Sequence, residues 1–160
     1  MENKNLFHKI ISTGFGSGYF PKAPGTAGAV LATIIWFGLA FVLSSNFLLI
    51  ATAFLIILFT VLGVWSSGVV EAYWGEDPSK VVVDEMVGVW IPLLAVSNEN
   101  KYYIYYALAA LILFRFFDIL KPLGIRKMDK IKGGWGIMLD DILAGLYSLL
   151  ILCVLIWLVG

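Results

Sequence analysis

The sequence predicts an all-α fold: a polytopic membrane helical bundle of about five transmembrane helices, with a cytoplasmic N-terminus. Of its 160 residues, 61% are hydrophobic, and the mean hydropathy is +0.92, whereas soluble domains are about half apolar. The apolar residues also gather in runs close to the ~20 residues that a spanning helix needs. We expect one membrane domain over residues 1–160, in which residues 1–26 form a cytoplasmic amphipathic and Gly-rich segment.

Five candidate spans follow along the chain: residues 27–45, 47–70, 78–97, 102–120 and 142–160. With the N-terminus inside, the inner segments hold nine of the eleven Lys and Arg residues, three in 1–26, one in 71–80 and five in 121–141. This distribution follows the positive-inside rule. The N-terminus and the basic segments, together with the acids near them, are therefore expected on the inner side of the membrane.

The third span depends on a helix-start signal, because its charge-free part, residues 86–97, is too short to cross a bilayer. Asp77 can serve as N-cap and Pro78 as the first helical residue. A helix over residues 78–97 would be about 30 Å long. If this run were re-entrant, the basic cluster of residues 121–132 would move to the outside.

The acid pair Asp84 and Glu85 lies in an otherwise apolar run. Ionised groups at membrane depth are costly and usually mark a functional site or pathway. Asp77, seven residues before Asp84, would share its helix face. Helix capping alone is the alternative role for Asp77.

A second set of charges ends the fourth span, where Arg115, Asp118 and Lys121 follow at three-residue steps in the string RFFDILKP. Such a row can bind a phosphate and orient a carboxylate. Snorkelling basic side chains around a salt-bridged Asp118 are the alternative.

A third set, Asp140 and Asp141, opens the fifth span in the string LDDILAG and echoes VDEMVG of the third. Both acid pairs would lie near helix N-termini, where the helix dipole favours anions. Five spans bring the acids of spans three, four and five to one membrane face.

The Gly-rich N-terminal segment could present backbone N–H groups to an anion, with Lys22 and Thr26 adding a charge and a hydroxyl. It contains no Walker loop, and a tight turn is the alternative reading. The single histidine, His8, and the single cysteine, Cys153, argue against phosphatases that need two histidines or a Cys–Arg pair. Several carboxylates on one face instead suit Mg²⁺, which prefers oxygen ligands and often works with phosphates.

Four ordered strings resemble the bacterial phosphatidylglycerophosphatase A family: PKAPGTAG, DPSKVVVDEMVG, RFFDILKP and GGWGIMLDDILAG. The resemblance implies a Mg²⁺-dependent phosphatase of the bacterial cytoplasmic (inner) membrane that converts phosphatidylglycerophosphate to phosphatidylglycerol and phosphate. Its active site would face the cytoplasm. Carried over residue by residue, its acidic positions are Asp77, Asp84, Glu85, Asp118, Asp140 and Asp141, and its other positions are Arg115, Lys121, Lys22 and Thr26.

We predict that four acids hold one or two Mg²⁺ ions, namely Asp84, Glu85, Asp118 and Asp141. Asp140 or Asp77 would support the site or act as base, while Arg115 and Lys121 would bind phosphate. The expected partners are the phospholipid substrate and the membrane, not nucleic acid. An ion-coupled transporter and a lipid-alcohol phosphotransferase are the alternatives, and the division of roles among the acids stays open.

Overall fold

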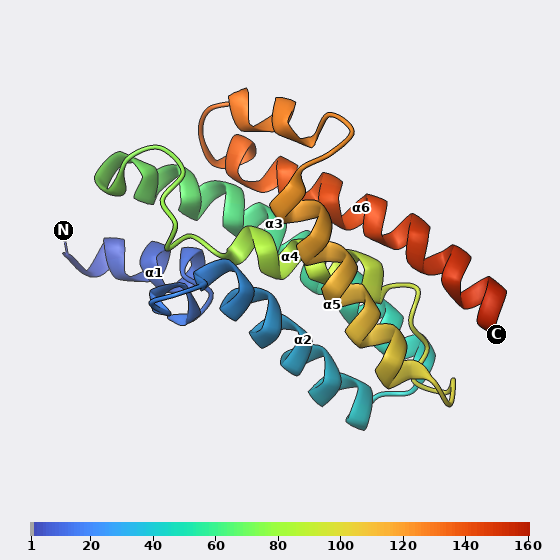
Figure 1. Ribbon diagram of the computed structural model, residues 1–160. Coiled ribbons are helices and arrows are strands. Elements are labelled where there is room, and N and C mark those ends of the chain that lie inside the picture. The colour runs from blue at the N-terminus through green and yellow to red at the C-terminus, as the bar shows by residue number, and fades with distance from the viewer. Residues whose placement is uncertain (1) are drawn as a thin grey trace.

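The computed structural model describes residues 2–160, with side chains from Asn5 onward, and every regular element in that range is helical (Figure 1). The all-α prediction is therefore confirmed. The elements are, in order, α1 (Glu2–Ser12), η1 (Ser17–Tyr19), α2 (Pro24–Val42), α3 (Ser45–Trp74), α4 (Val83–Leu93), α5 (Tyr103–Leu120), η2 (Ile125–Lys130) and α6 (Gly134–Val159).

Four of these helices, α2, α3, α5 and α6, are long and apolar enough to cross a membrane. Their outer surfaces carry many large apolar side chains, such as Phe41 on α2 (92% exposed) and Trp157 on α6 (81% exposed). Apolar patches of this extent are rare on soluble monomers and mark surfaces that meet another apolar phase. Length, composition and outer surface together indicate a membrane protein.

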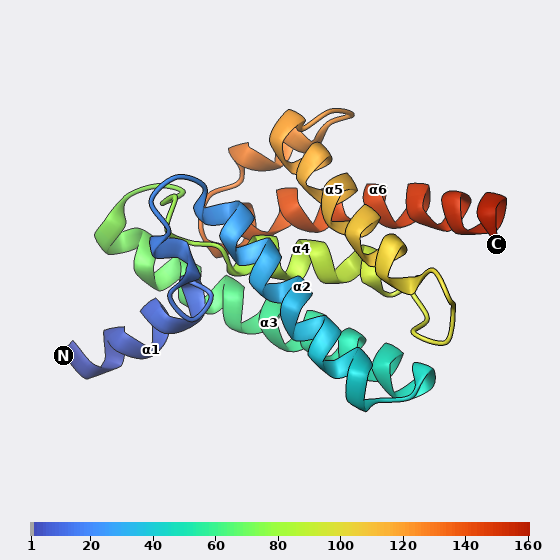
Figure 2. The ribbon, with the colours of Figure 1, turned by 60° about the horizontal axis from the view of Figure 1, so that its bottom comes forward.

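The short helix α4 forms the centre of the bundle and contacts α2, α3, α5 and α6 (Figures 1 and 2). Ten of its eleven residues are buried, as expected for a helix that is apolar on all sides. The Trp90 indole N–H donates to the Ala32 carbonyl oxygen at 2.9 Å, and its ring packs edge-on against Phe59. These contacts fix α4 against α2 and α3.

The prediction of a helix over residues 78–97 is wrong, because the helix begins only at Val83. Asp77 has φ 45°, in the left-handed region, whereas an N-cap residue is extended. The chain then reaches α4 without helical structure, and the Val82 N–H donates to the Ser12 carbonyl oxygen at 2.8 Å. Packing against the end of α1 therefore overrides the Asp-Pro start signal.

At 11 residues, α4 is about 16 Å long, too short to cross a bilayer alone, so the structure establishes four candidate spans and not five. The chain nevertheless runs from one end of the bundle to the other along α4 (Figure 2). Beyond α4, the Asn98 amide donates to the carbonyl oxygens of Ala40 and Leu43 at the C-terminal end of α2, at 2.7 and 2.8 Å. The start of α4 lies at the opposite end, beside the start of α2.

Glycines allow α4 and α6 to approach closely. A Cβ atom added at Gly145 would lie 2.5 Å from the Gly88 carbonyl oxygen, and one added at Gly88 would lie 2.9 Å from the Asp141 carbonyl oxygen. Larger residues would push the two helices apart. This approach brings the acid pairs of the two helices to one place.

Candidate active site

A cavity of about 470 Å³ opens at the end of the bundle where α2 and α4 begin and α5 ends. It is lined by every residue that the sequence analysis predicted to have a catalytic, metal-binding or phosphate-binding role. The ten predicted residues among its lining are Lys22, Thr26, Asp77, Asp84, Glu85, Arg115, Asp118, Lys121, Asp140 and Asp141. Residues up to 119 positions apart in the chain thus meet around one space.

Three of the acids form the innermost group of this cavity. Carboxylate oxygens of Asp84, Glu85 and Asp141 lie within 4.8 Å of one another. Asp84 and Asp141 are buried, and Asp84 Oδ1, Glu85 Oε2 and Asp141 Oδ1 accept no hydrogen bond from the described part of the chain. Buried anionic oxygens without partners are costly unless a cation neutralises them. We refer to Asp84, Glu85 and Asp141 as the acid triad.

The helix α4 supplies two members of the acid triad from its first turn. The partial positive charge of a helix N-terminus favours carboxylates there. Gly25, in the first turn of α2, lies so close to Glu85 that a Cβ at this position would collide with its carboxylate and lie 3.2 Å from Arg115 Nη1. A glycine at position 25 therefore lets the start of α2 close over Glu85 and Arg115.

The third member comes from α6, although not from the predicted place on that helix. Because α6 begins at Gly134, Asp140 and Asp141 are its seventh and eighth residues and lie beyond the first turn. The expectation that this pair sits at a helix N-terminus is wrong. The pair reaches the cavity because the Gly88–Gly145 approach places α6 beside α4.

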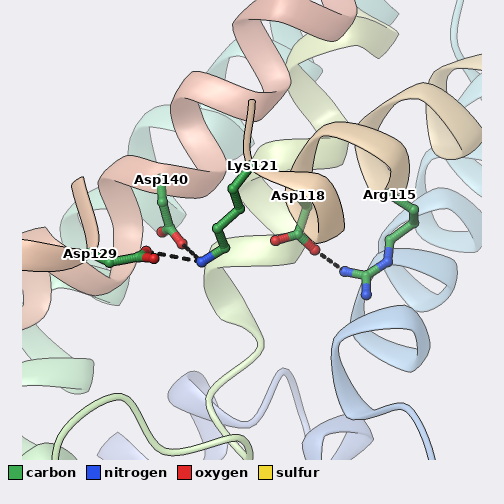
Figure 3. A network of polar contacts seen from close by, with 5 residues as sticks. All are labelled: Arg115, Asp118, Lys121, Asp129 and Asp140. Carbon is green, nitrogen blue, oxygen red and sulfur yellow. Dashed lines mark hydrogen bonds and ion pairs between the residues drawn. The ribbon is translucent and has the colours of Figure 1, made fainter. Parts of the chain in front are cut away.

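Two half-buried basic residues of the cavity are each held by an acid (Figure 3). Arg115 and Asp118, one turn apart on α5, form an ion pair. The Lys121 ammonium, just beyond α5, contacts Asp140 Oδ2 at 2.7 Å and Asp129 Oδ1 at 2.9 Å. Burial lowers the pKa of Lys121, but these two ion pairs outweigh burial and raise its pKa above the usual value, so its positive charge persists.

The remaining predicted residues lie at the rim of the cavity. Asp77 and Lys22 are exposed and Thr26 is half-buried. Asp77 and Asp84 do not share a helix face as predicted, because Asp77 belongs to the loop before α4. Both nevertheless line the same cavity.

Comparison with known proteins identifies the family. The sequence pattern described as phosphatidylglycerophosphatase A matches residues 10–156. The chain belongs to the phosphatidylglycerophosphatase A family. The resemblance inferred from the four sequence strings is thus confirmed, and these strings are the segments that surround the cavity.

Three curated relatives cover most of the chain. A protein of Bacteroides thetaiotaomicron named "Putative phosphatidylinositol-3-phosphatase" is 56% identical over 160 residues, which is 100% of both chains. A Haemophilus influenzae protein named phosphatidylglycerophosphatase A is 42% identical over 144 residues, covering 89% of this chain and 84% of the relative. An Escherichia coli protein of the same name is 33% identical over 150 residues, covering 92% and 82%. No solved structure matches the chain.

Two features of this family member were missed at the sequence level. Asp129, in η2, is a second partner of the Lys121 ammonium, but an exposed acid among Arg126, Lys127 and Lys130 carries no sequence signal for that role. The contact of Gly25 with Glu85 was also missed, although Gly25 stands in the string PKAPGTAG. The nearness of this string to the acids becomes visible only when α2 and α4 are placed side by side.

Proposed function

We propose that this protein is a Mg²⁺-dependent lipid phosphatase that hydrolyses the phosphomonoester of phosphatidylglycerophosphate to phosphatidylglycerol and phosphate. The reaction would take place at the cytoplasmic face of the bacterial inner membrane. Family membership and the names of two relatives support the reaction class and substrate. The single observation that carries the proposal is that the acid triad, with its buried unpartnered oxygens in the described structure, lines one cavity together with Arg115 and Lys121.

The acid triad suits a hard divalent cation. It offers three carboxylate groups, each with an oxygen lacking a partner in the described structure, and Mg²⁺ prefers such oxygen ligands. We therefore assign Asp84, Glu85 and Asp141 as the residues that hold Mg²⁺. When bound, the ion would supply Lewis-acid polarisation of a phosphoryl oxygen and a lowered pKa for a bound water.

Asp118, the fourth predicted metal ligand, has a different environment. It pairs with Arg115 and is not part of the 4.8 Å cluster. We assign it the orientation of the Arg115 guanidinium, and the metal-ligand role remains the rival assignment, which the Asp118→Asn variant described in the Discussion tests.

The basic residues provide the phosphate-binding part of the cavity. Arg115 can donate two parallel N–H groups to phosphate oxygens, while the Lys121 ammonium, fixed by Asp140 and Asp129, adds a point charge. Lys22 and Thr26 lie at the rim, where the phosphate would enter. Positive charges placed before the reaction stabilise the negative charge that develops on the phosphoryl group.

The chemical step in this proposal is attack of water on phosphorus. Asp140 or Asp77 accepts the proton of the attacking water, and the ester P–O bond breaks. The leaving glycerol oxygen then takes a proton from the carboxylic acid so formed or from solvent water. Asp140 lies deeper in the cavity and Asp77 lies at its rim. A phosphoaspartyl intermediate is the rival route, and a trapped phosphoenzyme would demonstrate it.

The deciding assay measures phosphate release by purified protein in nanodiscs containing phosphatidylglycerophosphate, with and without Mg²⁺. We expect release that requires Mg²⁺ and that falls sharply in Asp84→Asn. A substrate containing phosphatidylinositol 3-phosphate belongs in the same assay, because the 56% identical relative bears that activity in its name. Preferential turnover of this second lipid would support phosphomonoester hydrolysis but show that phosphatidylglycerophosphate is not the preferred substrate. No phosphate release from either lipid would overturn the proposal.

The structure gives little support to the transporter alternative. The acidic and basic side chains gather around one cavity at one end of the bundle, whereas a transporter needs charges along a path through the membrane.

Nine of eleven basic residues fall in segments that the proposed orientation places inside. Labelling of single cysteines introduced at Lys132 and at Lys101 from each membrane side would test that orientation.

A further inference from the structure

An apolar groove of about 360 Å³ runs along the outward face of α2, next to the charged cavity. Seven residues between Phe20 and Ile34 line it, and all of them except Thr26 are apolar. Phe20 at one end is 58% exposed and Ile34 is 59% exposed. The groove is therefore open to the surroundings of a helix that is long and apolar enough to cross a membrane.

The groove and the cavity share part of their walls. Ala23 and Thr26 line both spaces. From this junction one space extends toward the acid triad and Arg115, and the other extends along α2 to Ile34. Ile34 lies eight residues after Thr26, which corresponds to about 12 Å along the helix axis. A ligand with a charged head and a long apolar part would match both spaces.

We propose that this groove binds an acyl chain of the phosphomonoester lipid whose head group occupies the cavity, so that the substrate enters laterally from the bilayer past Ala23 and Thr26. This inference rests on the proposed function for the identity of the head group. A second groove, on α1 and lined by Leu6, Lys9 and Phe15 among others, shares no lining residue with the cavity. Of these two grooves, the α2 groove is the one that joins an apolar surface to the charged site.

Photolabelling tests the groove without relying on hydrolysis. The protein is placed in nanodiscs with a phosphatidate probe that carries a photoreactive group on one acyl chain, or with a phosphatidylcholine probe of the same chain. We expect residues 20–34 to be labelled at least fivefold more by the phosphomonoester probe, and excess phosphatidylglycerophosphate to suppress this labelling. Equal labelling by both probes would mean ordinary surrounding lipid and would overturn the proposal.

A matched pair of substitutions links the groove to catalysis. Ile34→Trp narrows the groove, and Ile112→Trp makes the same change at an exposed position on α5 (69% exposed), outside the groove and at a similar distance from the cavity end. We expect Ile34→Trp to lower kcat/KM for the long-chain lipid at least fivefold, mainly through KM, and to leave turnover of its acyl-free head-group analogue unchanged. Ile112→Trp should alter neither.

Failure of the groove and failure of the proposed function give different results. If wild-type protein releases no phosphate yet the phosphomonoester probe labels residues 20–34 selectively, the enzyme proposal falls and the lipid groove stands. If phosphate is released but Ile34→Trp and Ile112→Trp behave alike on the long-chain lipid, the groove proposal falls and the enzyme stands.

Discussion

The same cavity contains two groups of carboxylates with opposite environments. Asp84, Glu85 and Asp141 face one another, and each has an oxygen without a partner in the described structure. Asp118 and Asp140 instead contact Arg115 and Lys121 (Figure 3). The first group has no positively charged side chain paired with it in the described structure, whereas Arg115 and Lys121 neutralise the second group.

This difference indicates which acids would bind a cation and which acids orient a positively charged side chain. Like charges held close together disfavour one another's ionisation and destabilise the folded state unless a counter-ion binds. A carboxylate paired with Arg or Lys restricts that side chain to one geometry. The distinction could not be read from sequence, where all five residues are simply acids near apolar runs.

The largest expected effect comes from the acid triad. Asp84→Asn should lower phosphate release about 10³-fold, because metal-assisted charge stabilisation contributes several kcal/mol. The same change should raise the apparent melting temperature of the metal-free protein, since it removes one of three mutually repelling charges, and should reduce the increase that Mg²⁺ produces. Thermal unfolding with and without Mg²⁺ measures both effects.

Asp129→Asn is the matched control for Asp84→Asn, because it removes the same charge from an exposed position. It should leave the increase in melting temperature on Mg²⁺ addition unchanged. An Asp84→Asn protein that Mg²⁺ stabilises as strongly as wild type would show that Asp84 does not hold the ion.

The second effect concerns the paired acids and their bases. Arg115→Gln should lower kcat/KM about 10²-fold, the usual loss for a donor to developing negative charge. Asp118→Asn should cost about tenfold, because Arg115 remains but is less well oriented. In both variants, Mg²⁺ should stabilise the protein as it does wild type.

That last measurement separates the two roles assigned to Asp118. If Mg²⁺ no longer stabilises Asp118→Asn, then Asp118 is a metal ligand and the paired group contributes to the ion site. Such a result would break the division between the two groups of acids.

The third effect tests how the acid triad is assembled. A Cβ in Gly88→Ala would collide with the Phe114 ring and lie 2.9 Å from the Asp141 carbonyl oxygen, and overpacking of this kind costs about 1–3 kcal/mol. Gly38→Ala, on α2 with no atom within 4 Å of the added Cβ, should be neutral or stabilise by up to ~1 kcal/mol. Thermal unfolding measures the stability of the two variants. Equal stability would show that the close approach of α4 and α6 at Gly88 is not required for the fold.

The echo between VDEMVG and LDDILAG shows how far the sequence could lead. It correctly singled out two acid pairs, each followed by a glycine, but it could not show that Gly88 and Gly145 would pack against each other. The helical class and four of the five predicted spans followed from composition and run length. Whether a segment lies in lipid or in water determines these features, and the hydropathy and periodicity of the sequence indicate which of the two surrounds it. The ten predicted residues that line the cavity were singled out from charge placement, the Gly-rich segment and the family resemblance.

The start of α4 was mispredicted because a tertiary contact decided it. Asp77-Pro78 has the local form of a helix start, but the Val82 N–H bonds to the Ser12 carbonyl oxygen, seventy residues away in the chain. The division of the acids between paired and unpaired groups is likewise set by neighbours on other helices. Local sequence signals carry no information on such contacts.

The smallest effects come from the two acids that share one ammonium. Lys121 contacts buried Asp140 at 2.7 Å and Asp129 at 2.9 Å, and the side chain of Asp129 is 43% exposed. Exposed ion pairs contribute about 0–1 kcal/mol, so Asp129→Asn should lower kcat/KM at most about threefold. If Asp77 is the base, Asp140→Asn should cost about tenfold, because it removes the stronger of the two contacts that keep Lys121 charged against the effect of burial. If Asp140 is the base, the loss should be about 10²-fold or more.

The pH–rate profile distinguishes these variants further. Lys121 must be protonated to bind phosphate, so activity is lost as pH rises through its pKa, which the ion pairs raise above the usual value. Asp140→Asn lowers that pKa and should therefore move the alkaline loss of activity to lower pH, whereas Asp129→Asn should move it less. Equal shifts in the two variants would show that the buried and the exposed acid hold Lys121 equally well.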